Sequence, residues 1–309
     1  MNERAANGRI HNAFTIDVED YFQVESLSHV IGREQWSTME YRCEQNVARL
    51  LELLARRNVR GTFFILGWIA DRSPQLVRDI ARAGHEIACH GWSHRLIYRQ
   101  SPEEFRQETA RSKSLLEDLI GAPVHGYRAA SFSITRRSLW ALDTLLDLGF
   151  TYDSSIFPIR HANYGIPDAA LAPNVVSAPS GRSILEFPMS VAQFGALRLP
   201  VSGGGYFRIF PYWLTRHSLA RINQREGRPF VFYLHPWEID PGQPRVPAGL
   251  VSRLRHYTNL SKCAQRLERL LGEFAFAPMI EVLRGLAPQL AAPAFAATSV
   301  QVADPSRHA

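Results

Sequence analysis

Three carboxylates close an apolar run near the start of the chain. The run "FTIDVEDYF" (14–22) holds Asp17, Glu19 and Asp20 within four positions. Like charges this close repel each other, and a bound cation would offset the repulsion. The segment "HGWSH" places His90 and His94 four positions apart, so both imidazoles could reach one metal ion with a carboxylate from 17–20. Two histidines and one carboxylate leave coordination positions for water and substrate, which predicts a metal site of the catalytic kind.

The elements that must position these side chains alternate between helices and strands. Apolar periodicity and caps predict helices over 44–58, 73–84, 101–121, 135–149, 211–227 and 260–273. Apolar β-rich runs predict strands over 61–68, 85–90, 124–130, 150–155 and 229–235, and "MIEVL" follows the last helix. Repeated helix-to-strand units imply parallel strands with crossover helices, so we expect a barrel or a doubly wound sheet. The regular alternation is lost between 159 and 210.

Ionisable residues stand at the ends of five predicted strands, namely Asp17, His90, Arg128, Asp153 and His235. In a barrel, the C-terminal ends of parallel strands converge on one mouth. One such residue would be unremarkable as a surface or capping group. Five in the same register favour a common site.

Six motifs, taken in order, resemble a known family. "TIDVEDYF", "TFFILG", "GHEIACHGWSH", "GYRAASFSI", "YDSSIFP" and "FYLHPWE" resemble the polysaccharide deacetylases of the NodB-homology type, carbohydrate esterase family 4. The segments "DVEDYFQV", "DSSIFPIRHANYGIP", "GGGYFR", "LHPWEIDPGQPR" and "RHYTNL" are similar to the exopolysaccharide subgroup found beside exosortase (PEP-CTERM) systems. The resemblance covers roughly residues 12–275.

The resemblance implies a fold and an activity. The fold would be a single-domain α/β protein, a deformed (β/α)7-type barrel. The activity would be metal-dependent hydrolysis of N-acetyl groups on amino sugars. The cofactor would be one divalent ion, with Zn²⁺ favoured and Co²⁺, Ni²⁺ or Fe²⁺ as alternatives, and His90 and His94 match the family's two metal histidines.

The resemblance also assigns roles to the other strand-end residues. Asp17 matches the general base that takes a proton from the attacking water, and His235 is the candidate acid for the amine leaving group. Arg128 would hold Asp17 ionised, and Asp153 would orient His235 and favour its protonated form.

The third metal ligand has two candidates. The commonest family motif has two adjacent aspartates, whereas this chain has Asp-Val-Glu-Asp. If the strand continues through residue 19, Asp17 and Glu19 share a face. If the chain turns at Val18, Asp20 is the shorter and better-placed ligand, and this second arrangement is slightly favoured.

Other residues near the predicted mouth have less specific roles. Trp92, Tyr206 and Trp237 could stack on sugar rings, and packing is an equal interpretation. The family's third motif usually has proline where this chain has Ala130, which loosens a loop without removing any chemical group.

Composition limits the remaining alternatives. The 309 residues are 46% hydrophobic and 21% charged, which suits one large domain, expected over 12–285 between an extension (1–11) and a disordered tail (286–309). The net charge of +6 is dispersed, so we expect no nucleic-acid partner. Because the sequence shows no secretory signal and no transmembrane run, we expect a cytoplasmic protein. It would be peripheral at the inner membrane face if its saccharide is lipid-linked and is handled by membrane-associated exopolysaccharide machinery.

Two rival functions stay open. They are hydrolysis of a small cyclic amide or ureide, as in an allantoinase, and saccharide binding without catalysis.

Overall fold

A curved, mostly parallel sheet forms the centre of the molecule. The computed structural model describes residues 9–290. The sheet has the strand order β10-β1-β2-β3-β4-β5-β7-β6, with β11 also paired to β1, and only β6 and β7 pair antiparallel. Its strands are β1 (His11–Val18), β2 (Thr62–Ile65), β3 (Glu86–Cys89), β4 (Gly126–Tyr127), β5 (Tyr152–Asp153), β6 (Asn174–Ser177), β7 (Ser183–Glu186), β10 (Val231–Leu234) and β11 (Ala275–Ala277).

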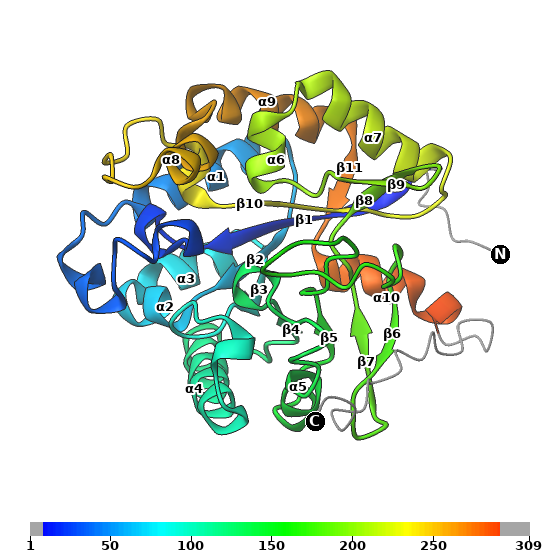
Figure 1. Cartoon of the computed structure of the whole chain (residues 1–309), viewed down its shortest axis with the longest axis horizontal. Coiled ribbons are helices and arrows are strands. Elements are labelled where there is room, and N and C mark those ends of the chain that lie inside the picture. The colour runs from blue at the N-terminus through cyan, green and yellow to red at the C-terminus, as the bar shows by residue number, and fades with distance from the viewer. Residues whose placement is uncertain (1–8, 291–309) are drawn as a thin grey trace, which may run out of the picture.

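Helices cover the outside of this sheet (Figure 1). They are α1 (Cys43–Arg56), α2 (Gly67–Arg72), α3 (Pro74–Arg82), α4 (Pro102–Ile120), α5 (Ala141–Asp147), α6 (Gly204–Ile209), α7 (Tyr212–Gln224), α8 (Leu250–Tyr257), α9 (Leu260–Glu273) and α10 (Met279–Leu290). Helix α4 begins and ends at capping residues that are recognisable in the sequence. The hydroxyl of Ser101 accepts from the Glu104 amide (3.2 Å), the Glu104 carboxylate accepts from the Ser101 amide (2.8 Å), and Gly121 closes the helix at φ 66°.

The period of two along β1 decides which side chains face the site. Phe14, Ile16 and Val18 pack into the core between sheet and helices. Ala13 packs instead with the apolar side chains on the other face of the sheet. Asp17 is four positions from Ala13 and therefore lies on that same face, which is where the polar site forms.

The hydrogen-bonded path of strands is open between β6 and β10, and the segment 187–203 lies across the opening. This segment carries the two-stranded sheet of β8 (Val191–Phe194) and β9 (Leu197–Pro200). The Phe187 amide donates to the carbonyl of Asp153 (2.9 Å), and the Tyr233 amide donates to the carbonyl of Ser202 (2.7 Å). Gly203, at φ 128°, passes so close to β10 that a Cβ would lie 1.9 Å from the Tyr233 carbonyl oxygen. The mixed α/β single-domain fold is confirmed. The strand order resembles that of a barrel, but the end strands β6 and β10 are not paired with each other, so the sheet is not closed by hydrogen bonds.

Several sequence-based boundaries need correction. The predicted strand 61–68 ends at Ile65, because α2 begins at Gly67. "MIEVL" lies in α10, and the preceding short strand is β11. The irregular stretch 159–210 contains β6 to β9 and α6. The proposed tail starts too early, since α10 continues to Leu290; residues 1–8 and 291–309 lie outside the described residues. Within 9–290, no helix combines the length and apolarity needed to cross a membrane.

Candidate metal centre

One buried carboxylate and two buried histidines meet at the C-terminal ends of β1 and β3. Glu19 follows β1, and His90 and His94 follow β3. One potential ligand atom from each of the three lies within 4.8 Å of the others. All three side chains are buried, so their polar atoms need partners from within the protein or from a bound ion.

His90 is held in the tautomer that a metal ligand requires. Its Nδ1 lies 2.8 Å from the carbonyl oxygen of Arg128, which can only accept a hydrogen bond. Nδ1 therefore carries the proton, and Nε2 keeps a lone pair. Burial lowers the pKa of His90, which favours the same neutral form. A histidine that donates one ring N–H to a backbone carbonyl is typical of metal sites.

His94 presents a second neutral imidazole to Glu19. Its backbone adopts a left-handed conformation, φ 50°, in the loop that follows β3. Burial lowers the pKa of His94 well below its ordinary value, with the nearby His90 and His235 adding to the effect. Its Nε2 lies 3.0 Å from Oε2 of Glu19. With His94 neutral, this close approach gives no ion pair.

The donor set of these residues fits a divalent cation. Oε2 of Glu19 is buried and has no hydrogen-bond donor among the described residues. Burial raises the pKa of Glu19 to about 7, with His235 opposing the rise and Asp17 adding to it. A cation beside Oε2 would satisfy this oxygen and stabilise the ionised carboxylate. Neutral imidazole nitrogen and carboxylate oxygen are ligands that zinc accepts.

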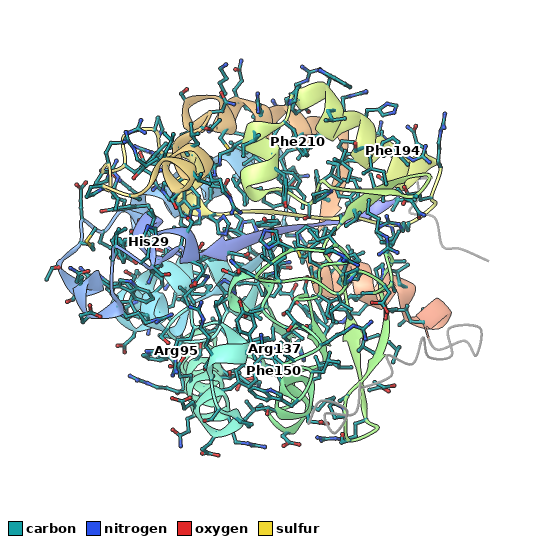
Figure 2. The ribbon with its side chains drawn as sticks, in the orientation of Figure 1. His29, Arg95, Arg137, Phe150, Phe194 and Phe210 are labelled. Atoms are coloured by element: carbon teal, nitrogen blue, oxygen red, sulfur yellow. The ribbon has the colours of Figure 1, made fainter. Side chains whose placement is uncertain are left out.

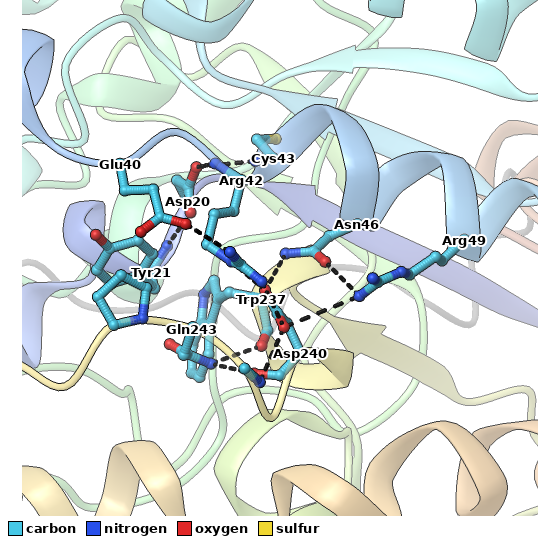
Figure 3. Close-up of polar contacts among 12 residues, drawn as sticks. Asp20, Tyr21, Glu40, Arg42, Cys43, Asn46, Arg49, Trp237, Asp240 and Gln243 are labelled. Atoms are coloured by element: carbon cyan, nitrogen blue, oxygen red, sulfur yellow. Dashed lines mark hydrogen bonds and ion pairs between the residues drawn. The ribbon is translucent and has the colours of Figure 1, made fainter.

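Asp20 does not share this arrangement, which corrects the sequence-based preference for it. One carboxylate oxygen accepts from the Tyr21 amide (2.8 Å), and the other accepts from the amides of Arg42 (2.6 Å) and Cys43 (2.9 Å) (Figure 3). Asp20 is thus the N-cap of a short 3-10 helix, η1 (Tyr21–Gln23), and ties it to the start of α1. The geometry makes Glu19 the candidate ligand.

Asp17 and Arg128 form a buried ion pair beside the three candidate ligands. Nη1 of Arg128 donates to Oδ1 of Asp17 (2.6 Å) and to the hydroxyl of Thr15 (2.8 Å). Nε and Nη2 donate to the carbonyl and hydroxyl oxygens of Ser154, so the guanidinium is fixed both by β1 and by the residue that follows β5. Arg128 is completely buried and Asp17 is 2% exposed. The pairing expected between these two residues is therefore present in the structure.

His235 is oriented by a residue that the sequence analysis missed. Nδ1 of His235 lies 2.7 Å from Oε1 of Glu238, and Nε2 lies 3.1 Å from Oε1 of Glu19. Burial alone would lower the pKa of His235, yet these two carboxylates raise it to about 9. Glu238 also accepts from the His235 amide (3.1 Å), which closes the first turn of η6 (Pro236–Ile239). The capping signature His-Pro-Trp-Glu was the available signal for this contact.

Asp153, which was predicted to orient His235, has other partners. Oδ1 of Asp153 accepts from the Ser155 hydroxyl (2.6 Å), and the strand register places Asp153 opposite Glu186 of β7. Burial raises the pKa of both carboxyls, that of Asp153 to about 6, and the Asp153 charge adds to the rise for Glu186. The two residues form a buried carboxyl pair on β5 and β7.

Arg208 fixes the other side of Glu238. Its Nε donates to Oε2 of Glu238, and both groups are buried. Its two terminal nitrogens donate to the carbonyls of Arg255, His256 and Thr258, each at 2.9 Å. Although burial opposes ionisation, Arg208 and His235 lower the pKa of Glu238 to about 2. Arg208 lies in the "GGGYFR" segment, so a residue outside the predicted catalytic set supports the site.

The three predicted sugar-stacking aromatics lie in different surroundings. Trp237 is 5% exposed and is stacked between His235 (5.3 Å between ring centroids) and His256 (4.2 Å), so it packs. The guanidinium of Arg111 lies 3.4 Å from the ring centroid of Trp92 and covers it. Tyr206 is partly exposed, and its hydroxyl is 3.4 Å from that of Tyr164. This tyrosine pair is the better candidate for contact with a saccharide.

Two family models match successive segments of the chain. Residues 32–152 match the family model described as "Polysaccharide deacetylase". Residues 154–284 match a separate model, "Domain of unknown function (DUF3473)". The polysaccharide deacetylase segment contains both histidines of the candidate metal centre and Arg128, whereas His235 and Glu238 lie in the second segment.

Relatives and solved structures extend the comparison. The chain is 34% identical over 73 residues to a peptidoglycan-N-acetylglucosamine deacetylase from Bacillus cereus, a match covering 24% of this chain and 26% of that protein. It is 28% identical over 113 residues to a peptidoglycan deacetylase from Helicobacter pylori, covering 37% of this chain and 38% of that protein. The matches thus span about a quarter and about two fifths of these relatives.

Two solved structures share the fold over almost the whole chain. A probable polysaccharide deacetylase from Pseudomonas aeruginosa PAO1 aligns with a TM-score of 0.62 and 19% identity, covering 91% of this chain and 92% of that one. Puue allantoinase aligns with a TM-score of 0.58 and 15% identity, covering 92% of each. At these identities the likeness concerns the fold alone.

Proposed function

We propose that the protein is a metal-dependent deacetylase that hydrolyses N-acetyl groups of amino sugars in a bacterial exopolysaccharide or its lipid-linked precursor. The observation that carries the proposal is the meeting of Glu19, His90 and His94 beside the Asp17–Arg128 pair and His235. This set combines a cation site, a base and an acid. Amide hydrolysis needs all three, because water is a weak nucleophile and an amine leaves only when protonated.

Glu19, His90 and His94 would hold one divalent ion, which we propose is Zn²⁺. When bound, the ion would polarise the acetyl carbonyl and lower the pKa of water. Glu19 suits this position since its other oxygen, Oε1, contacts Nε2 of His235 (3.1 Å). The carboxylate can thereby connect the metal centre to the proposed acid.

The remaining residues would move and hold protons. Asp17 would take the proton of the attacking water, while Arg128 fixes the orientation of its carboxylate and stabilises its charge. His235 would deliver a proton from Nε2 to the departing amine, and Glu238 would hold the ring through Nδ1. We further propose that Tyr164 and Tyr206 line the saccharide site.

The setting of the reaction follows from the same resemblance that suggests the substrate. We propose that the chain belongs to the exosortase-associated exopolysaccharide subgroup and acts in the cytoplasm at the inner membrane face. A lipid-linked or nascent saccharide would be available to the protein there. The segments around Tyr164 and His235 carry the similarity to that subgroup.

Metal analysis together with acetate release from N-acetylhexosamine oligomers tests the proposal. His90→Ala should lose both metal and activity, because it removes a ligand. Asp17→Asn should keep the metal and lose activity, since an amide cannot take the proton. His217→Ala is a matched control, because His217 is exposed on α7 and should leave both properties unchanged.

Specific outcomes would contradict the proposal. Full activity in either site variant would remove the residue assignments. Turnover of a cyclic ureide without any acetate release would favour the allantoinase-like alternative. Saccharide binding without hydrolysis by the metal-loaded protein would favour a binding module.

A further inference from the structure

The surface of α8 exposes large apolar side chains next to arginines. Leu250, Val251 and Leu254 are 71%, 72% and 58% exposed, although α8 is only eight residues long. Arg253 and Arg255 on the same helix are also exposed. We refer to these five residues as the α8 surface. Neighbouring exposed aliphatic groups are costly in water and commonly mark a contact surface.

The segment that carries the α8 surface contains basic residues and no acidic ones. Residues 241–262 contain Arg245, Arg253, Arg255 and Lys262 and no aspartate or glutamate. The neighbouring short helix η2 (Glu25–Leu27) contacts α8 and brings one carboxylate, but Glu25 lies 3.2 Å from the guanidinium of Arg99. The apolar groups are therefore set in a cationic surrounding.

The α8 surface lies at the catalytic end of the molecule. Strands β1 and β10 point toward the end where α8 and the segment after β1 are found (Figure 1), and His29 of that segment is labelled at this end in Figure 2. His256 on the inner side of α8 stacks on Trp237 (4.2 Å), which stacks on His235 (5.3 Å). These stacked rings connect the inner side of α8 to the proposed acid.

We propose that the α8 surface docks onto an anionic lipid bilayer, with the aliphatic side chains inserted among the lipids and the arginines at the phosphates. Apolar residues flanked by arginine are typical of helices that lie in a membrane interface. A second copy of this chain is a poorer occupant, because symmetric pairing of the α8 surface would bring its arginines against each other. The inference deepens the proposed membrane-face reaction and identifies the residues that would make contact.

Co-sedimentation with vesicles tests this docking. The metal-loaded full chain should bind phosphatidylglycerol vesicles at least tenfold more tightly than phosphatidylcholine vesicles, and about 0.5 M salt should weaken the binding by screening. The triple variant Leu250→Ser, Val251→Ser, Leu254→Ser should bind at least tenfold more weakly, and Arg253→Glu roughly tenfold more weakly. Leu197→Ser and Arg225→Glu change exposed residues of the same kinds elsewhere and should bind like the unchanged protein.

Acetate release from a soluble oligosaccharide separates this inference from the proposed function. The α8 variants should keep that activity, so a protein that binds vesicles but releases no acetate would contradict only the proposed function. Equal binding to both vesicle types, no binding, or unchanged binding by the α8 variants would overturn the docking proposal. It would also be overturned if the unchanged chain forms a dimer that the triple variant abolishes.

Discussion

The two adjacent carboxylates after β1 have different partners. The two oxygens of Glu19 approach different imidazoles, Oε2 that of His94 (3.0 Å) and Oε1 that of His235 (3.1 Å). The shorter Asp20 is occupied by three backbone amides. The two neighbouring acids therefore have separable roles, one in the site and one in local folding.

The Glu19→Gln and Asp20→Asn variants should separate these roles. Glu19→Gln should lose most of the bound metal and the activity, because it removes the charge from the proposed ligand set. Asp20→Asn should keep the metal but lower the free energy of unfolding by about 1–3 kcal/mol, because an amide cannot accept as well at both positions. Metal content and denaturant unfolding measure the two effects, and loss of metal in Asp20→Asn alone would reverse the assignment.

Glu238→Gln tests whether Glu238 orients His235. The pKa of His235 is raised to about 9 by Glu19 and Glu238, and the substitution would keep the shape of the Glu238 side chain but remove its part of that effect. We expect kcat to fall roughly 10- to 100-fold with bound metal unchanged, and the alkaline loss of activity to move to lower pH, because the acid deprotonates earlier. The pH profile of kcat checks this. Asp153→Asn is the comparison, and an equal alkaline shift there would restore the original assignment.

At the scale of elements, β5 and β7 bring two acids together in the core. Asp153 and Glu186 are register partners, and both are fully or almost fully buried. Oδ2 of Asp153 and Oε2 of Glu186 have no hydrogen-bond partner among the described residues. Two such carboxyls are best accommodated when they share a proton. The pair therefore makes the stability of this part of the sheet dependent on pH.

Glu186→Gln should remove part of this dependence. The pKa of Glu186 is raised by burial above its unfolded value of 4.5, so its contribution to stability is complete below that pH and is lost as pH rises toward the folded pKa. A glutamine stays neutral and can donate to Asp153. We therefore compare the free energy of unfolding of Glu186→Gln with that of the unchanged chain at each pH. The difference, variant minus unchanged chain, should increase as pH rises from about 5 to about 8, by at most about 1.4 kcal/mol per pH unit. Denaturant unfolding across this range checks the sign, and a decrease would exclude proton sharing by Glu186.

At the scale of the whole molecule, an ion at the candidate metal centre would link distant parts of the chain. Glu19 follows the first strand, His94 follows the third, and Glu19 also contacts His235 beyond β10. An ion that binds only the folded chain stabilises it by mass action.

Metal removal should therefore lower stability. At a metal concentration of about 1,000 times Kd, the free energy of unfolding should be about 4 kcal/mol higher than after chelation. His94→Ala should remove this increment, whereas His217→Ala should keep it. Thermal unfolding with and without chelator measures the difference. A chelator-insensitive Tm in the unchanged protein would argue against the metal centre.

Much of the architecture could be predicted from local signals. The capping box at Ser101, the stop at Gly121 and the apolar runs of β2 and β10 depend on residues close in sequence. Strand ends also deliver Asp17, His90 and His235 to one end of the sheet, because parallel strands share a direction. The predictions failed where a short strand or a helix start depends on packing, as at Gly67 and in 159–210.

The sequence by itself determined the alternating fold and the types of residue that could bind a metal and move protons. Only the tertiary structure decided the partners: Glu19 instead of Asp20 beside the histidines, and Glu238 instead of Asp153 beside His235. The reason is that spacing fixes the face from which a side chain departs, whereas its partner depends on groups brought close by the rest of the chain. Arg208, far from Glu238 in sequence but buried against it, shows how much of that environment comes from distant segments.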